Sequence, residues 1–291
     1  MSHSLWRLAT NLSLRGRILL GAALPLAAGL AVLSFADVGR SIWRMQLLLI
    51  GIALLLAVAG QCLDRRMHGF APAHAMVFLT LTGIGAPLLI QSSVPHRWIP
   101  LGPLHLYIAP LLLPSFFAAC SVYVRKRGKN SAIAFMALVG VSVLLALHPD
   151  ASQVLALLAA AAALFGRFRT DLFRSVITLI VIALVAGGAF TRPDPLAPVP
   201  YVEGVFALAF EHSLLAGCAV LASALSLIVC LYFHSRRGAD WLIAVAAYYA
   251  TLFAGSAAGL TPAPLIGYGA GPLLGYGFMA AVSLWFDPEA D

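Results

Sequence analysis

Long apolar stretches alternate with short polar connections along almost the whole chain. A helix needs about 20 mostly apolar residues to cross a bilayer, and ten stretches approach or reach that length. The predicted spans are Ile18–Phe35, Met45–Leu63, Pro72–Ile90, Leu104–Val124, Ser131–Leu147, Ala151–Gly166, Leu172–Phe190, Glu203–Phe233, Trp241–Leu260 and Pro272–Phe286. The pattern therefore predicts one all-α integral membrane domain over residues 1–291, with about ten transmembrane helices.

The basic residues favour one orientation of these spans. With the N-terminus inside, only Arg40, Arg44, Arg97 and Arg192 face outside, which leaves 14 of the 18 Lys and Arg residues on the inside. Cytoplasmic loops carry an excess of Lys and Arg. The distribution therefore predicts that both termini are cytoplasmic and that the number of spans is even.

Composition supports a membrane protein and excludes a nucleic-acid partner. Hydrophobic residues make up 62% of the chain and charged residues 10%, with a mean hydropathy of +0.95. Soluble domains are about 45–50% apolar and about 25% charged. The net charge of +7 could suit a nucleic acid, but the basic residues lie in short loops, as topology signals do. The four cysteines lie in or beside apolar stretches without C-x-x-C spacing, which is typical of small buried hydrophobes.

The predicted outside connections are richer in turn-forming residues than the inside ones. Four of them contain VPHRWIPLGP, HPDAS, TRPDPLAPVP and TPAPLIGYGAG. Pro and Gly at membrane depth free backbone groups that protein or a water-filled cavity must satisfy. We therefore expect a functional site, if there is one, on the outside.

Two carboxylates lie at the start of the eighth predicted span. A charge at the centre of a bilayer costs about 2.5–3.5 kcal/mol on insertion scales, so Glu203 and Glu211 need a reason to be there. Glu211 and His212 are neighbours and point about 100° apart on a helix. The simplest interpretation is that Glu211 pairs with a polar group inside the bundle.

Three other polar stretches allow both a structural and a functional interpretation. Asp150, after His148, is either a helix N-cap worth about 1 kcal/mol or a site residue. Arg97 and Trp98 are either interface anchors or a binding point for an anionic headgroup or pyrophosphate. The glycines between Pro264 and Gly277 either pack helices or form backbone that lines a cavity. His96, His105 and Asp150 do not form a metal-binding motif.

Taken together, four of these stretches resemble motifs of the SEDS family, the FtsW/RodA/SpoVE-like proteins of bacterial wall synthesis. HRWIPLG (96–102) is similar to R-R-W-I-x-L-G, and LHPDASQ (147–153) is similar to L-Q-P-D-x-G-T. VEGVFALAFEH (202–212) is similar to T-D-F-I-F-A-x-x-A-E-E, and PAPLIGYGAG (262–271) to P-L-P-F-x-S-Y-G-G-S. The motifs occur in the family's order, and the resemblance covers about residues 97–286. It implies a SEDS-like bundle of ten spans.

The resemblance also implies an activity. Family members polymerise lipid II by transferring the growing glycan from its undecaprenyl pyrophosphate to a sugar hydroxyl of the next lipid II. Glu203 stands where the family has its essential Asp and would be the catalytic base. The implied substrate-binding residues are Arg97, Trp98, Asp150, Arg192, Tyr268 and Gly269, with Glu211 and His148 in support. A divalent cation, Mg²⁺ or Mn²⁺, is an optional cofactor.

The same resemblance implies where the chain works and with which partners. The expected location is the bacterial inner (cytoplasmic) membrane, with chemistry at its outer face in cell division or cell shape. The expected partners are membrane lipid, lipid II and a class B penicillin-binding protein.

Two departures from the family pattern predict weakened polymerase activity. The family's Q-P-S-E-x-x-K falls on Tyr107–Leu113, which lacks its Glu and Lys. Glu203 in place of Asp moves the carboxylate by about 1 Å, and such a misplacement can cost about 10²-fold in rate. The alternatives are a catalytically weakened relative that binds lipid or partner proteins, and a lipid II flippase or transporter. The gathering of polar groups on one side gives the transporter only weak support.

Overall fold

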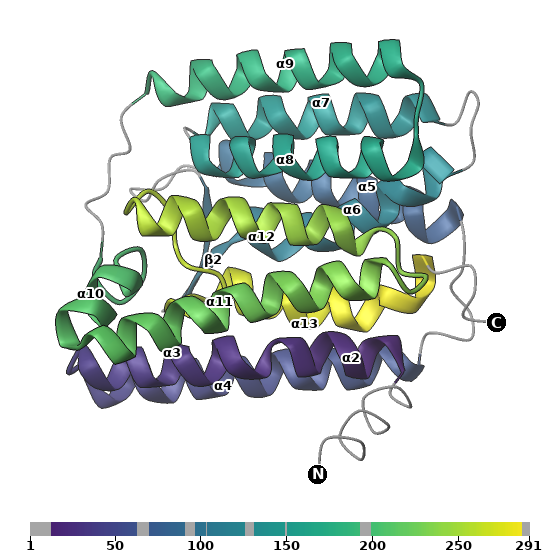
Figure 1. The fold of residues 1–291 in the computed structure, drawn as a ribbon. Coiled ribbons are helices and arrows are strands. Elements are labelled where there is room, and N and C mark those ends of the chain that lie inside the picture. Colours follow the sequence, from purple (N-terminus) through teal and green to yellow (C-terminus); the bar gives the residue numbers. More distant parts are fainter. Residues whose placement is uncertain are drawn as a thin grey trace.

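The computed structural model describes residues 13–62, 70–90, 97–102, 104–125, 131–148, 150–192 and 199–286, with Gln61 and Leu104 described by their backbone only. Long helices run roughly side by side and form one bundle, with a short hairpin and a short helix at one end (Figure 1).

The bundle contains α2 (Leu14–Gly21), α3 (Ala23–Phe35), α4 (Arg40–Ala59), α5 (Phe70–Gly85), α6 (Ile108–Arg125), α7 (Ser131–Leu147), α8 (Ala151–Phe168), α9 (Leu172–Phe190), α10 (Val205–His212), α11 (Leu214–Ser235), α12 (Leu242–Ala257) and α13 (Ala270–Val282). Short 3₁₀ helices follow α4, α5 and α13: η1 (Gly60–Cys62), η3 (Ala86–Leu89) and η4 (Ser283–Phe286). The strands β1 (Trp98–Leu101) and β2 (Leu104–Tyr107) form an antiparallel pair.

The predicted membrane architecture is confirmed. Among the described residues, seven helical stretches are long and apolar enough to cross a membrane, and three further apolar stretches are shorter: Ser131–Leu147, Leu242–Ala257 and Ala270–Phe286. Each of the ten predicted spans overlaps one of these stretches. The protein is therefore an all-α, multi-pass membrane protein.

Helix α6 forms the centre of the bundle. In its apolar window 89% of residues are buried, against 17% in α4 and 28% in α9. A helix that is apolar all round is typically a buried one. Helix α13 packs closely on it, because a Cβ on Gly275 would lie 2.1 Å from the Pro110 carbonyl oxygen. Gly275 therefore lets two helix backbones approach, and Gly277, farther along α13, also lines a small apolar pocket.

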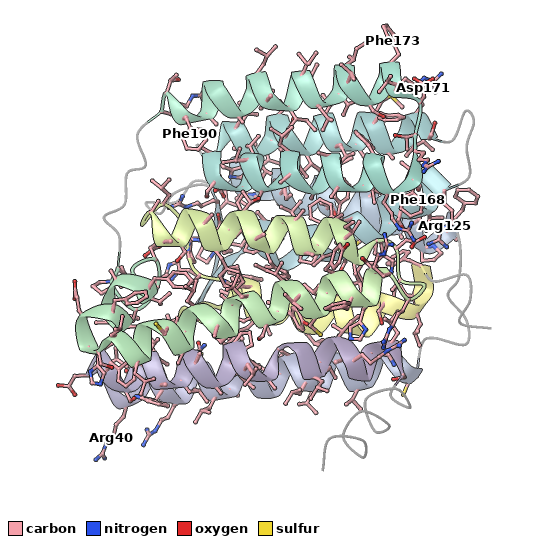
Figure 2. All side chains as sticks on the ribbon, in the orientation of Figure 1. Arg40, Arg125, Phe168, Asp171, Phe173 and Phe190 are labelled. Atoms are coloured by element: carbon pink, nitrogen blue, oxygen red, sulfur yellow. The ribbon has the colours of Figure 1, made fainter. Side chains whose placement is uncertain are left out.

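The two ends of the bundle differ in their residues. We call the end with the first turn of α2 the inner end, and the opposite end the outer end. The Arg15 side chain donates from Nε and Nη2 to the carbonyls of Ala280 and Ala281, at 2.9 and 2.7 Å. The start of α2 and the end of α13 therefore lie together at the inner end. Arg125 and Asp171 lie at that end in Figure 2, and Arg40 and Phe190 lie at the outer end.

The fourth predicted span begins later than expected. Residues 104–107 form β2 rather than helix, and α6 begins at Ile108. Gly102 follows β1 with a φ of 62°, a conformation that favours glycine. The backbone therefore turns back into a second strand before the helix begins.

The eighth predicted span is not one helix. Helix α10 has only eight residues and ends at His212. The next residue, Ser213, has an extended backbone, and its Oγ accepts a hydrogen bond from the Ala216 N–H at 3.1 Å. Serine is a strong N-cap, so α11 starts afresh at Leu214. The two helices pack on each other: a Cβ on Gly217 would lie 2.2 Å from the Phe210 ring.

Candidate functional site

Polar side chains from four separate segments gather at the outer end. The segments are the hairpin with Arg97 before it, the turn at residues 148–150, the stretch 199–204 before α10, and the connection between α12 and α13 (Figure 1). Each segment carries one of the motifs singled out in the sequence. His96 and Pro149, which belong to two of those motifs, lie outside the described residues, as do residues 193–198 of the connection before α10.

The hairpin places Arg97 against two aromatic rings. The strand register sets Trp98 opposite Tyr107, and their rings meet edge to face at 6.4 Å. The Arg97 guanidinium carbon lies 5.4 Å from the Trp98 ring centroid and 6.0 Å from that of Tyr107. Cation–π contacts of this length stabilise an arginine that is partly withdrawn from water. The hairpin therefore holds the guanidinium in a defined position.

Asp150 is buried and does not cap α8. It precedes the first residue of α8, but its side chain makes no capping hydrogen bond. The Tyr107 hydroxyl donates to Oδ2, and Ser152 Oγ donates to Oδ1 at 3.3 Å. Only 1% of Asp150 is exposed. The capping interpretation is therefore wrong, and the carboxyl faces the hairpin.

Burial and the neighbouring groups act in opposite directions on the pKa of Asp150. Burial raises the pKa of the carboxyl, whereas Arg97, the Tyr107 hydrogen bond and His148 lower it. Burial, followed by the charge of Asp150, raises the pKa of the Tyr107 hydroxyl well above its usual value, so Tyr107 keeps its proton and acts as the donor.

His148 completes the wall of a small pocket. Its Nε2 donates to the Ile84 carbonyl at 2.7 Å, which fixes the ring against the end of α5. A pocket of about 10 Å³ is lined by Arg97, His148 and Asp150, together with Ile84, Pro87, Ile108, Ala109 and Leu145. The structure thus brings together three of the residues that the sequence singled out.

Glu203 lies in a tight turn just before α10. Its Oε2 accepts a hydrogen bond from the Val199 N–H at 2.8 Å, and its own N–H donates to the Val199 carbonyl at 2.9 Å. Ser256 Oγ, at the end of α12, donates to the Glu203 carbonyl at 2.9 Å. The carboxylate is therefore held beside its own turn and not in the middle of a membrane span.

The connection between α12 and α13 links the Glu203 turn to the hairpin. The N–H groups of Ala263 and Tyr268 donate to the carbonyls of Val202 and Tyr201, at 3.1 and 3.0 Å. A few residues later, a Cβ on Gly271 would lie 2.4 Å from the Tyr107 carbonyl oxygen. Glu203 and the Arg97–Asp150 pocket are therefore parts of one continuous packed layer at the outer end.

Tyr268 and Gly269 lie within this connection. The Tyr268 ring meets the Tyr201 ring edge to face at 6.2 Å. Burial, together with Tyr201, raises the pKa of the Tyr268 hydroxyl. Gly269 has an extended backbone and immediately precedes α13. Both residues lie beside the Glu203 turn.

Two predicted residues have other surroundings. Arg192 is exposed, and its Nη1 donates to the Ala146 carbonyl in the last turn of α7 at 3.3 Å. A cation suits the negative end of a helix dipole. Glu211 is exposed on α10, and the neighbouring His212 stacks on Phe35 at 4.0 Å. The expectation that Glu211 pairs inside the bundle is therefore wrong, because Glu211 lies on the exposed side of α10.

Sequence reasoning missed Tyr107 and the buried pair of Gln153 and Tyr248. Tyr248 donates from its hydroxyl to Gln153 Oε1 at 2.7 Å, one turn of α8 below Asp150. These partners lie 43 and 95 residues apart in the chain. The sequence shows Tyr107 only as a tyrosine at the end of a stretch that contains prolines. Nothing in that stretch predicts that Asp150 is its hydrogen-bond partner.

The described side chains do not form a site for a divalent cation. Within the described part of the chain, no group of three His, Cys, Asp or Glu residues could hold a metal ion. The oxygens of Asp150 already accept hydrogen bonds from Tyr107 and Ser152.

Comparisons with known proteins gave matches at the level of structure only. No protein-family model matches the chain, and no curated protein does. The rod shape determining protein RodA of Thermus thermophilus matches with a TM-score of 0.70 and 19% identity, over 91% of this chain and 95% of that one. An aspartate-to-alanine mutant of the same protein matches with a TM-score of 0.71 and 20% identity, over 91% and 96%.

A third solved structure, of a peptidoglycan synthase complex described as coordinating polymerization and crosslinking, matches with a TM-score of 0.67 and 20% identity, over 91% of this chain and 96% of that one. All three likenesses extend over nearly the whole chain. The predicted SEDS-like bundle is therefore confirmed as a fold: this membrane protein has the fold of RodA.

Proposed function

We propose that this chain is a SEDS-type peptidoglycan polymerase that acts on lipid II. The observation that carries the proposal is the likeness to RodA over 91% of the chain. It is supported by the position of the four motif segments, which meet in one layer at the outer end. Fold alone does not define an activity, so the proposal depends on the residues of that layer.

Glu203 is the proposed general base. It would take the proton from the sugar hydroxyl of the incoming lipid II while that oxygen forms the new glycosidic bond, and undecaprenyl pyrophosphate would leave with the bonding electrons. A positioned base typically contributes about 10²–10⁴-fold in rate. The hydrogen bond from the Val199 N–H supports this role, because it orients the carboxylate.

Arg97 is the proposed cation for the leaving pyrophosphate. A guanidinium is planar and always charged, so it suits phosphate oxygens well. The two rings against which it packs, Trp98 and Tyr107, would keep it in place without neutralising it. The proposed further binding residues are Asp150, Arg192, Tyr268 and Gly269.

The proposed location is the bacterial cytoplasmic membrane, with the outer end facing away from the cytoplasm. The inner end carries Arg15, Arg167 and Arg237, in keeping with the excess of basic residues on cytoplasmic sides. The proposed partner is a class B penicillin-binding protein. The match to a synthase complex that couples polymerization to crosslinking supports this choice.

Polymerisation by the purified chain, given labelled lipid II, tests the proposal. The wild type should form glycan chains, Glu203→Ala should lose about 10²–10⁴-fold in rate, and Glu203→Asp should be faster than the wild type. Glu211→Ala is the matched control, because Glu211 is an exposed acid near the same end, and it should stay close to wild type. Unchanged polymerisation in Glu203→Ala would remove the assigned base.

A second candidate is a relative that binds lipid or partner proteins without polymerising glycan. Pro110 and Leu113 are buried apolar residues where the family motif has Glu and Lys, which favours this candidate. It predicts that Glu203→Ala rescues a deletion strain as well as the wild type does. Movement of the lipid II headgroup across liposomes without polymer would instead indicate a transporter.

A further inference from the structure

Asp150 has an unusual position for an aspartate at the start of a helix. An N-cap aspartate normally accepts hydrogen bonds from the first backbone N–H groups of its helix. Here the side chain makes none of them and turns towards the hairpin instead. Its two oxygens accept hydrogen bonds from Tyr107 and, more weakly, from Ser152. Something other than helix capping therefore determines where this carboxyl points.

Tyr107 is held firmly from two sides. Its ring packs edge to face on Trp98, its partner in the strand register. Its carbonyl oxygen lies against Gly271 at the start of α13, where any side chain would collide with it. Only 7% of Tyr107 is exposed. The backbone of Tyr107 is therefore fixed, and the position of its hydroxyl determines how the Asp150 carboxyl is oriented.

We propose that Tyr107 is a positioning residue. Its hydroxyl holds the Asp150 carboxyl on the wall of the pocket that Arg97 and His148 also line. In that position the carboxyl accepts a hydrogen bond from a sugar hydroxyl of the substrate. The identity of the substrate in this inference rests on the proposed polymerase function. The geometry of the Tyr107–Asp150 pair is independent of that function. Tyr107 lies in the segment where this chain departs from the Q-P-S-E-x-x-K motif of the family. The Tyr107–Asp150 pair is therefore a feature of this chain's own sequence.

Among the described residues, four titratable or charged groups act on Asp150. Arg97 and Tyr107 belong to the hairpin segment, His148 to the turn after α7, and Tyr248 to α12. Arg97, Tyr107 and His148 favour the ionised carboxyl, whereas burial opposes it. Removing the Tyr107 hydroxyl takes away one favourable hydrogen bond and leaves the other groups in place, so the carboxyl should hold its proton to higher pH.

Infrared titration of the purified full-length chain tests the inference without any need for activity. The band of the protonated Asp150 carboxyl is identified by its loss in Asp150→Asn. In Tyr107→Phe this band should persist about one to two pH units higher than in the wild type. Ser152→Ala removes the longer hydrogen bond, so it is the matched control and should shift the band less.

A second variant reaches the same pair from the backbone. Gly271→Ala leaves both side chains intact but displaces the Tyr107 carbonyl, and it should shift the band in the same direction as Tyr107→Phe. A Tyr107→Phe titration that equals the wild type, or a shift no larger than that of Ser152→Ala, overturns the positioning role. The same holds if Tyr107→Phe lowers only the unfolding midpoint.

Polymerisation assays separate this inference from the proposed function. With lipid II, the acid limb of the rate profile in Tyr107→Phe should move to higher pH by the same interval as the infrared band, with a raised KM and a nearly unchanged kcat. If no variant and no wild-type sample forms glycan while the infrared shift is present, the polymerase proposal fails and the positioning role stands. If glycan forms but the infrared band does not move, the polymerase proposal stands and the positioning role of Tyr107 fails.

Discussion

The inner and outer ends of the bundle use charged residues in different ways. At the inner end, Arg15 binds two carbonyls in the last turns of α13, and Arg167 pairs with Asp240. These contacts complete helix ends and join neighbouring helices. At the outer end, Asp150 and Glu203 lie in turns before helices and accept hydrogen bonds from other groups in that layer. Neither Asp150 nor Glu203 caps a helix with its side chain, and both are acids that we propose for function.

Replacement of Arg97 should have the largest effect at the outer end. Arg97→Ala removes the proposed cation for the leaving pyrophosphate, and the loss of one such electrostatic group typically costs about 10²–10³-fold in kcat. Arg97→Lys keeps the charge but not the planar guanidinium, so it should recover only part of the rate. The polymerisation rate on lipid II is the measurement. An Arg97→Ala rate within twofold of the wild type would contradict the assignment.

Arg15 should show the opposite behaviour at the inner end. Arg15→Met keeps much of the apolar stem and removes two charged hydrogen bonds in a buried position, and each such bond is worth about 1.5–3 kcal/mol. The free energy of unfolding in detergent should fall by about that amount or more. The polymerisation rate per folded molecule should stay unchanged. A loss of rate without a loss of stability would contradict the division between the two ends.

Asp150 should make stability depend on pH. Burial raises its pKa in the folded chain above the ordinary value of 3.8, so the folded state holds the proton more tightly than the unfolded state. The resulting stabilisation is full below pH 3.8 and is lost as the pH rises towards the folded pKa, by at most about 1.4 kcal/mol per pH unit. Asp150→Asn should remove this dependence. Unfolding midpoints of both proteins between pH 4 and pH 8 provide the check, and parallel curves would contradict it.

The Arg167–Asp240 pair should have the smallest effect. The two side chains are 34% and 26% exposed, and exposed ion pairs contribute about 0.2–1 kcal/mol. Arg167→Gln should therefore lower the unfolding midpoint slightly, with a larger difference at low salt than at high salt. If Arg167→Gln lowered the unfolding midpoint as much as Arg15→Met does, the exposure of an ion pair at the inner end would not predict its contribution to stability.

The sequence predicted the helices better than the contacts between them. Apolar length alone located each of the ten helical stretches, because a bilayer demands about 20 such residues whatever their neighbours are. The break at Ser213 was missed because the packing of Phe210 on Gly217 depends on how α10 folds back. The strand at residues 104–107 was missed because its apolar residues continue directly into α6.

The candidate site was only partly predictable for a related reason. The four motifs indicated the right connections, and Arg97, His148 and Asp150 do line one pocket. The hydrogen bond between Tyr107 and Asp150 joins residues 43 positions apart, and no local pattern encodes it. Glu211 was expected inside the bundle because the eighth span was predicted as one continuous helix, whereas Glu211 is exposed on the short helix α10.

The most direct test of the account measures rate and stability on the same purified samples of Glu203→Ala and Arg15→Met. Glu203→Ala should lose about 10²–10⁴-fold in lipid II polymerisation with an unfolding midpoint close to that of the wild type. Arg15→Met should unfold more easily but polymerise at the wild-type rate per folded molecule. If Glu203→Ala polymerises normally, or loses rate only in proportion to its loss of folded protein, the functional assignment of the outer end is wrong.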